Sequence, residues 1–339
     1  MKFLSRNDAL SLGLQNRIEI VNHLLQCVSE VHLSRRKRTK QHEGLCKSSG
    51  RFREKYPELP SRAVVLHDFR IACRRCETAL TVLEHHSQHR DVSWLLRRLK
   101  DVRDRCNPVC DSEVFVKWLL NQPPSPTQQQ LVQSTTTEIK NGYPIVSRAA
   151  KALLNSHRLK RILRSFISSH AEHSNVASDG GRSDYNSVLG SQELAPRPDI
   201  TRTRNHQLAR WLFSNINQFV QSLPDDSHDF DEMHEFRIAT KRLRYAMEFM
   251  IETIPGVDLT ESIQLLEQAQ EQLGDVHDAE VRQNRLQDEQ SEVDNLTPFL
   301  RAAREEARHH EQQWKTWWKP SKFQNILCQS AAAISQLFH

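Results

Sequence analysis

The sequence predicts an all-α protein, and three observations lead to this fold class. The chain of 339 residues contains only 9 Gly, fewer than the corners of a barrel or a Gly-rich phosphate loop would need. Apolar residues recur every three or four positions along most of the chain, which is the period of an amphipathic helix. No stretch alternates apolar and polar residues with the period of two that indicates a β-strand.

The apolar period and the prolines delimit the helices expected in the first half. The first helix is expected over residues 7–31, where one stripe contains Leu10, Leu14, Ile18, Val21, Leu25 and Val28. The period returns at 62–86 and 92–105, and Asn107-Pro108 is expected to interrupt it. After this break, and around the prolines at 123–126, helices are expected at 112–120, 131–140 and 145–168.

Two segments lack the apolar period. Residues 35–55 hold nine Lys or Arg against two Glu, which predicts a basic loop or a frayed helix end. Residues 171–201 are rich in Gly, Ser, Pro and Asp, which predicts a flexible linker between a first half, 7–170, and a second half, 202–337. Beyond the linker, helices are expected at 204–222, 230–253, 258–273, 275–289, 296–318 and 323–337.

Composition and charge exclude several classes of protein. Hydrophobic residues make up 37% of the chain, and no apolar run approaches the roughly 20 residues that cross a bilayer, which excludes a membrane-embedded protein. The N-terminus carries charges where a signal peptide would be apolar, so a cytoplasmic location is expected. The 7 Cys are an odd number scattered along the chain, which indicates reduced thiols.

A nine-residue segment occurs twice. Residues 67–75 read His-Asp-Phe-Arg-Ile-Ala-Cys-Arg-Arg and residues 234–242 read His-Glu-Phe-Arg-Ile-Ala-Thr-Lys-Arg, so six of nine positions are identical. Each copy is followed by Leu-x-Asp-Val-x-Asp, at 99–104 and at 273–278. In a weaker third similarity, Lys151 and Arg158 correspond to Lys315 and Lys322. This repeated order predicts two similar helical bundles related by a pseudo-two-fold axis.

Each repeated segment places cations on one helix face, because a helix turns by about 100° per residue. The opposite face holds apolar residues such as Phe69 and Phe236 and is expected to face the core. The first stripe consists of His67, Arg70, Arg74 and Arg75, and the second of His234, Arg237, Lys241 and Arg244. A solvated face is the alternative interpretation, but such a face favours pairs of opposite charge, whereas these stripes are cationic in both copies. Arg offers a planar fork to phosphate oxygens and Lys a point charge. Two facing stripes would therefore make a basic groove or channel that suits a polyanion.

These motifs resemble the CHAD domain, the conserved histidine α-helical domain. The resemblance includes the segment Lys241-Arg242-Leu243-Arg244-Tyr245-Ala246-Met247-Glu248 and runs from about residue 7 to 337. It implies two pseudo-two-fold related four-helix bundles with a basic central groove or pore. It also implies non-catalytic binding of inorganic polyphosphate and targeting to polyphosphate granules. No cofactor is expected.

The candidate polyphosphate-binding residues follow from this resemblance, position by position. In the two nine-residue segments and just beyond them they are His67, Arg70, Arg74, Arg75, His234, Arg237, Lys241, Arg242 and Arg244. In the other repeated segments they are Arg103, Lys151, Arg158, Lys315 and Lys322. The first half departs from the second at Cys76-Glu77, which stands where the second half has Leu243-Arg244.

Other functions are open. A nonspecific nucleic-acid binder would need exposed aromatic residues among the cations, and the stripes contain none. An enzyme that hydrolyses or transfers phosphoryl groups of polyphosphate would need an acidic cluster that holds a metal, and no such cluster is legible. Binding of other polyanions stays open.

Two further patterns have a structural and a metal-binding interpretation. A zinc site is conceivable at Cys73, Cys76, Cys106 and Cys110, but cysteines on an apolar helix face are expected to lie in the core. The acid pairs of the two Leu-x-Asp-Val-x-Asp motifs are expected to cap a helix start or to orient a nearby Arg rather than to bind a metal.

Overall fold

The computed structural model describes residues 9–49, 54–56, 58, 60–83, 89–167, 198–224, 230–291, 293 and 295–337. These residues form helices and no strands. The first half contains α1 (Ala9–Ser29), α2 (Arg35–Ser48), α4 (Arg62–Leu80), α5 (His89–Leu120), α6 (Pro126–Asn155) and α7 (His157–Ile167). The second half contains α8 (Pro198–Gln221), α9 (Phe230–Thr253), α10 (Thr260–Asp288), α11 (Thr297–Trp317) and α12 (Pro320–Gln336). The predicted all-α fold class is confirmed.

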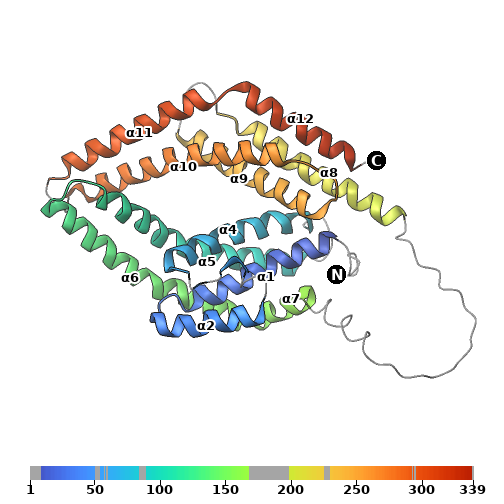
Figure 1. Ribbon diagram of the computed structural model, residues 1–339, viewed down its shortest axis with the longest axis horizontal. Helices are drawn as coiled ribbons and strands as arrows, with labels where there is room; N and C mark the ends of the chain where they lie inside the picture. The colour runs from blue at the N-terminus through green and yellow to red at the C-terminus, as the bar shows by residue number, and fades with distance from the viewer. Residues whose placement is uncertain are drawn as a thin grey trace, which may run out of the picture.

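The helices of the two halves lie on two sides of the molecule. In Figure 1 the helices up to α7 occupy one side, and α8 to α12 occupy the other. The two sides meet where α1 and α4 contact α9. The pseudo-two-fold relation between the halves stays a prediction.

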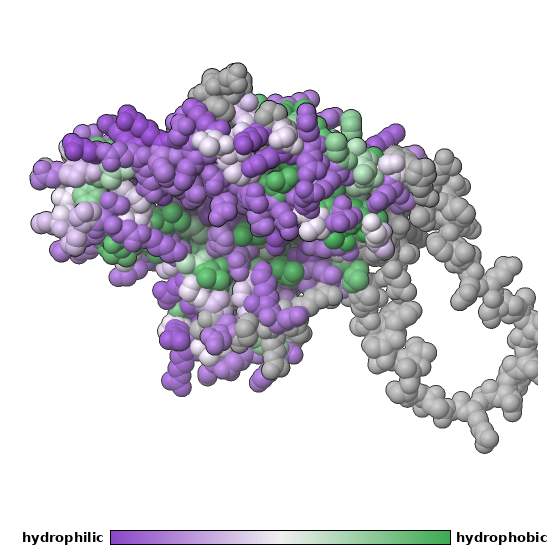
Figure 2. Space-filling view, turned by 45° about the horizontal axis from the view of Figure 1, so that its top comes forward, coloured by the Kyte–Doolittle hydropathy of each residue, from purple (hydrophilic) through white to green (hydrophobic). Residues whose placement is uncertain are grey.

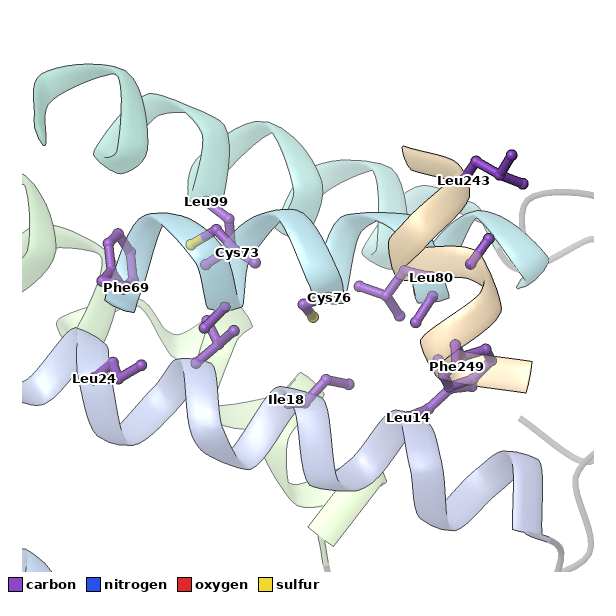
Figure 3. Packing of buried hydrophobic residues seen from close by; sticks show 14 of the residues in the cluster. Leu14, Ile18, Leu24, Phe69, Cys73, Cys76, Leu80, Leu99, Leu243 and Phe249 are labelled. Atoms are coloured by element: carbon purple, nitrogen blue, oxygen red, sulfur yellow. The ribbon is translucent and has the colours of Figure 1, made fainter. Parts of the chain in front are cut away.

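One buried apolar cluster runs through both sides at this contact. Figure 3 shows α1 and α4 facing each other, with Leu14 and Ile18 on α1 and Cys76 on α4 between them. Phe249 of α9 packs into the same cluster and is fully buried. A Cβ atom at Gly13 would lie 2.6 Å from Thr253 Cγ2, so α1 approaches α9 too closely for a side chain at that position.

A second, smaller core joins the far ends of the two sides. Phe115 of α5, Leu131 of α6 and Phe299 of α11 belong to it. A hydrogen bond also joins the two halves beside this core: Trp118 Nε1 donates to Glu306 Oε2 at 2.7 Å. The two halves are therefore joined at two separate places.

Three predicted helix boundaries are wrong, because single helices run through them. α5 continues through Pro108, α6 continues through Pro144, and α10 continues through Gly274. A proline or a glycine inside a helix costs helix stability, and burial of neighbouring residues such as Cys106 and Val109 offsets that cost. Tertiary packing overrides the local propensity at these sites.

The prediction of a loop or frayed helix end at 35–55 is wrong for residues 35–48, which form α2. This helix is polar, but Arg38 is buried and donates a hydrogen bond from Nη2 to the backbone O of Pro60 at 2.8 Å. Leu45 is also buried against the core. Of the predicted linker, 171–197 lies outside the described residues, and 198–201 forms the first turn of α8.

The surface of the described residues is largely polar. Figure 2 shows mostly hydrophilic side chains on one face, with small hydrophobic patches between them. Among the described helices, none has the length and apolar composition that a bilayer crossing would require.

Candidate functional site

The two nine-residue repeats lie in the middle of α4 and in the N-terminal part of α9. Ser61 Oγ accepts a hydrogen bond from the backbone N of Val64 at 3.2 Å, which caps the start of α4. The first turn of α9 contains Asp231 and Glu232, whose charges suit the positive end of the helix dipole. Both helices therefore begin where the local sequence favours a start.

One face of each helix is buried, as the apolar period predicts. On α4 the buried residues include Phe69, Ala72, Cys76, Ala79 and Leu80. On α9 they include Phe236, Ala239, Leu243, Ala246, Met247 and Met250. The predicted apolar faces are confirmed.

The remaining faces bring cations of the two helices together. We call this set the cationic cluster, and it consists of Arg70, Arg74, Arg237 and Lys241. The charges of Arg70 and Arg74 both lower the pKa of Arg237, after the larger effect of burial. The same two charges also lower the pKa of Lys241. The structure therefore gathers four of the predicted residues in one place.

Three members of the cluster lack an acidic partner. The side chains of Arg74, Arg237 and Lys241 form no ion pair and no hydrogen bond within the described part of the chain. Arg237 Nε is buried without a hydrogen-bond partner. Burial, followed by Arg237 and the other neighbouring cations, lowers the pKa of Lys241 to about 6. A partly buried cation without a counter-ion is destabilising, so the cluster holds the positive charge of its arginines at a cost to stability.

Three imidazoles border the cluster. The rings of His234 and His277 lie 5.0 Å apart between centroids. Burial lowers the pKa of His67 and of His234, and nearby cations contribute in the same direction. Burial and, as the next largest cause, the charge of Arg237 together lower the pKa of His277 to about 3. All three imidazoles are therefore neutral at pH 7 in this state.

Two carboxylates lie at the edge of the cluster. Asp111 of α5 is 4.0 Å from Arg70, measured from Oδ1 to Nη1, and burial raises the pKa of this acid while Arg70 lowers it. Asp278 of α10 acts on Arg237 and on Lys241 by favouring their charged forms. The acids do not form close pairs with these two cations, so positive charge remains in excess.

The arrangement suits a ligand with several closely spaced negative charges. Arg binds phosphate or carboxylate oxygens with two parallel hydrogen bonds, and Lys binds them as a point charge. An anion at this place would compensate the buried charges that the protein leaves without partners.

One known protein family matches this chain. The family model of the CHAD domain matches residues 61–287, which is most of the chain and includes both cation-bearing helices. The chain belongs to the CHAD domain family.

Two solved structures resemble this CHAD domain protein. The crystal structure of the CHAD domain from the plant Ricinus communis has a TM-score of 0.51 and 18% identity, and the match covers 97% of this chain and 94% of that one. PptA from Streptomyces chartreusis has a TM-score of 0.43 and 12% identity, and the match covers 94% of this chain and 99% of that one. The Ricinus structure shows the same fold. No curated protein matches the chain.

Three predicted binding residues of this CHAD domain face acids instead of the cluster. Arg75 Nε lies 2.9 Å from Glu248 Oε2. Arg244 is 6% exposed and lies 2.9 Å from Glu267, measured from Nη1 to Oε1. Arg103 forms an ion pair with Glu77, the acid that stands where the second half has Arg244. The charges of these three residues already have protein partners. Contact of Arg75, Arg103 and Arg244 with polyphosphate stays a prediction.

The other candidates lie elsewhere. Arg158 lies 2.7 Å from Asp91, measured from Nε to Oδ1, and Lys315 lies 2.6 Å from Glu311, measured from Nζ to Oε1. Lys322 Nζ is 3.6 Å from the centroid of the Trp317 ring. Lys151 and Arg242 are exposed on α6 and α9. A binding role for these residues also stays a prediction.

Three residues at or near the site were not predicted from the sequence, and they are His277, Asp111 and Lys117. His277 lies inside the second Leu-x-Asp-Val-x-Asp motif, so the repeat could have indicated it. Asp111 and Lys117 have no counterpart in the repeat, and only the packing of α5 brings them near Arg70 and His67.

The structural interpretation of the cysteines is confirmed. The candidate zinc ligands are all buried, and they are Cys73, Cys76, Cys106 and Cys110. Burial raises the pKa of the Cys76 thiol to about 12, which disfavours the thiolate that zinc binds. The described residues contain no group of three or more His, Cys, Asp or Glu placed to hold a metal.

The expectation that the acid pairs cap a helix start is wrong, since both motifs lie inside helices. Asp101 pairs with Arg98 at 3.2 Å and Asp104 with Lys100 at 2.7 Å, each measured from the side-chain N to Oδ2, on the surface of α5. Asp278 instead acts on Arg237, which agrees with the alternative of orienting a nearby Arg.

Proposed function

We propose that this CHAD domain protein binds inorganic polyphosphate through the cationic cluster and does not turn it over. One observation carries the proposal: Arg74, Arg237 and Lys241 are partly buried basic residues that form no ion pair in the described structure. Neighbouring cations with a structural role, such as Arg75 and Arg244, have acids beside them.

Polyphosphate fits the charge of this site. Each phosphate of the chain carries a negative charge and oxygens that two guanidinium N–H groups can reach together. A chain that passes between α4 and α9 would meet cations from both helices. Binding is expected to weaken steeply with salt, because a polyanion releases counter-ions when the protein binds it.

A nucleic-acid binder is the alternative function, and the aromatic residues disfavour it. Nonspecific binding of single strands uses exposed rings on which bases stack. Tyr245 contacts two of the repeated cations and is 2% exposed. Its ring lies under Arg75 and Arg244, whose guanidinium carbons are 5.6 Å and 5.0 Å from the centroid. Tyr245 therefore offers no surface to a base.

The location follows from the ligand. A protein that binds polyphosphate would collect at polyphosphate granules in the cytoplasm. The same cations also suit other polyanions. No residue of the site is assigned as a catalytic nucleophile.

The test compares cations of the cluster with an exposed cation of α8. Arg237→Gln and Lys241→Gln each change a basic residue of the cluster, and Arg210→Gln removes an exposed cation outside the candidate residues. Loss of a charge-assisted contact is expected to raise the Kd for long-chain polyphosphate about tenfold or more. Arg210→Gln should change the Kd less than about threefold at the same ionic strength.

The double charge reversal Arg237→Glu with Lys241→Glu should abolish binding while circular dichroism shows unchanged helicity. Retained affinity in this variant, or an equal loss in Arg210→Gln, would place the ligand elsewhere on the basic surface.

A further inference from the structure

His277 occupies a position that the binding motif does not include. It lies on α10, where Leu273 and Val276 of the same motif are buried and orient the helix. Its ring lies 5.0 Å from the ring of His234 on α9, measured between centroids. The charges of Arg237 and Lys241 act on it as well. His277 therefore borders the cationic cluster from a third helix.

The groups that surround His277 and Lys241 come from several helices. Around these two residues, α9 contributes His234 and Arg237, α4 contributes Arg70 and Arg74, and α10 contributes Asp278. Helix α5 contributes Asp111, which acts on Asp278 and Arg237.

The other helices that pack on α10 contact different residues of it. His310 of α11 acts on Asp275, and Gln329 of α12 bonds to Glu261 near the start of α10, with Nε2 2.5 Å from Oε2. Cations thus outnumber acids around His277 and Lys241.

Without a ligand, the protonated forms of Lys241 and His277 are disfavoured. Burial and the neighbouring cations lower the pKa of Lys241 to about 6 and that of His277 to about 3. At neutral pH both side chains are then mainly uncharged, although each is a base that a nearby anion would protonate.

We propose that His277 is a further ligand-facing residue of the site, and that His277 and Lys241 take up protons when polyphosphate binds. This inference rests on the proposed function. A bound anion stabilises the protonated forms, so the complex binds more protons than the free protein, and the affinity rises as the pH falls.

The two residues act in different pH ranges. Lys241 contributes between its ordinary value of 10.5 and about 6, and it contributes nothing more below that range because it is already protonated in the free protein. His277 contributes below its ordinary value of 6.5 and down to about 3. Lys241 therefore dominates above neutral pH, and His277 adds to the effect in mildly acidic buffer.

Isothermal titration calorimetry with long-chain polyphosphate measures this coupling directly. Titrations of the full chain in two phosphate-free buffers with different ionisation enthalpies give the number of protons taken up. At about pH 7.5 we expect about one proton per site, and a Kd that falls up to about tenfold per pH unit between about pH 8.5 and 7.

Variants assign the protons. Lys241→Gln should lose the uptake at about pH 7.5, and the control Arg210→Gln, which removes an exposed cation of α8 outside the candidate residues, should keep it. His277→Gln should keep the uptake at about pH 7.5 and should lose the additional uptake that the wild-type protein shows near pH 5.5. Thermal unfolding of each variant confirms that it folds.

The outcomes separate this inference from the proposed function. Binding with a Kd that does not change with pH, or uptake that survives in the double variant Lys241→Gln with His277→Gln, would overturn the inference alone. No binding at any pH would overturn the proposed function and this inference with it.

Discussion

Arg75 of α4 forms an ion pair with Glu248 of α9, with 2.9 Å between Nε and Oε2. The backbone O of Arg75 also accepts a hydrogen bond from Arg17 Nη1 of α1 at 3.1 Å, and Arg17 Nη2 lies 3.1 Å from Glu252 Oε2 of α9. These contacts join three helices and both halves of the chain. Arg74, the neighbour of Arg75, forms no such pair in the described structure, so adjacent cations of the repeat differ in their pairing.

Arg75→Met should therefore lower stability without affecting binding. Loss of this partly exposed pair is expected to reduce the free energy of unfolding by about 1–2 kcal/mol, because Glu248 loses a partner at the contact between the halves. Urea denaturation measures the loss, and the Kd for polyphosphate should change less than about threefold. The control Arg74→Met should do the opposite. A larger loss of binding in Arg75→Met than in Arg74→Met would contradict this division of roles.

Lys241→Met should stabilise the protein while it weakens binding. Burial lowers the pKa of Lys241 to about 6 in the folded protein from an ordinary value of 10.5. Between these values the unfolded chain binds more protons, so this lysine makes stability rise with pH over that range. Its removal should increase the free energy of unfolding by about 1 kcal/mol or more at neutral pH.

Urea denaturation of the wild-type protein and of Lys241→Met at several pH values tests this prediction. The difference between the two proteins should be largest near pH 6 and should shrink toward pH 10. A variant that is less stable at every pH would show that Lys241 serves the fold and not a ligand.

Gly13 provides a test of the contact between α1 and α9. An added Cβ would lie 2.6 Å from Thr253 Cγ2 and 3.1 Å from Phe249 Cε2, and both partner side chains are buried. Gly13→Ala should therefore cost about 1–3 kcal/mol in urea denaturation. Gly44→Ala is the matched control, because a Cβ there meets nothing within 4 Å. It should stabilise α2 by about 0.5–1 kcal/mol, and similar effects of the two changes would contradict the close approach.

The cysteines are expected to differ sharply in reactivity. Cys328 is exposed, whereas burial raises the pKa of Cys27 and of Cys76 to about 12. A thiol reagent added to the native protein should modify Cys328 first, and all 7 Cys only after denaturation. Mass spectrometry of the labelled peptides identifies the sites. Fast modification of Cys76 in the native protein would show that α4 opens away from α1.

The sequence was sufficient for the fold class and for the faces of the two central helices. The apolar period placed Phe69 and Phe236 in the core, and both are fully buried. Helix boundaries were less predictable, because proline and glycine are local signals. Packing of neighbouring residues carries α5 through Pro108 and α6 through Pro144.

The composition of the cluster could be predicted only in part. The repeat indicates Arg70, Arg74, Arg237 and Lys241, but it also indicates Arg75 and Arg244, which have acidic partners. Pairing depends on which acids the fold brings near. Glu248 and Glu267 lie outside the nine-residue segments, so the repeat alone does not distinguish a structural cation from one that is left for a ligand.

The most direct test of the central claim is a competition titration of the wild-type protein with long-chain polyphosphate at two salt concentrations. Single-stranded RNA and DNA are added as competitors at matched phosphate concentration. We expect tight binding that weakens with salt and that nucleic acid does not displace. Displacement by nucleic acid at equal phosphate, or absence of polyphosphate binding, would contradict the assignment of the cationic cluster to polyphosphate.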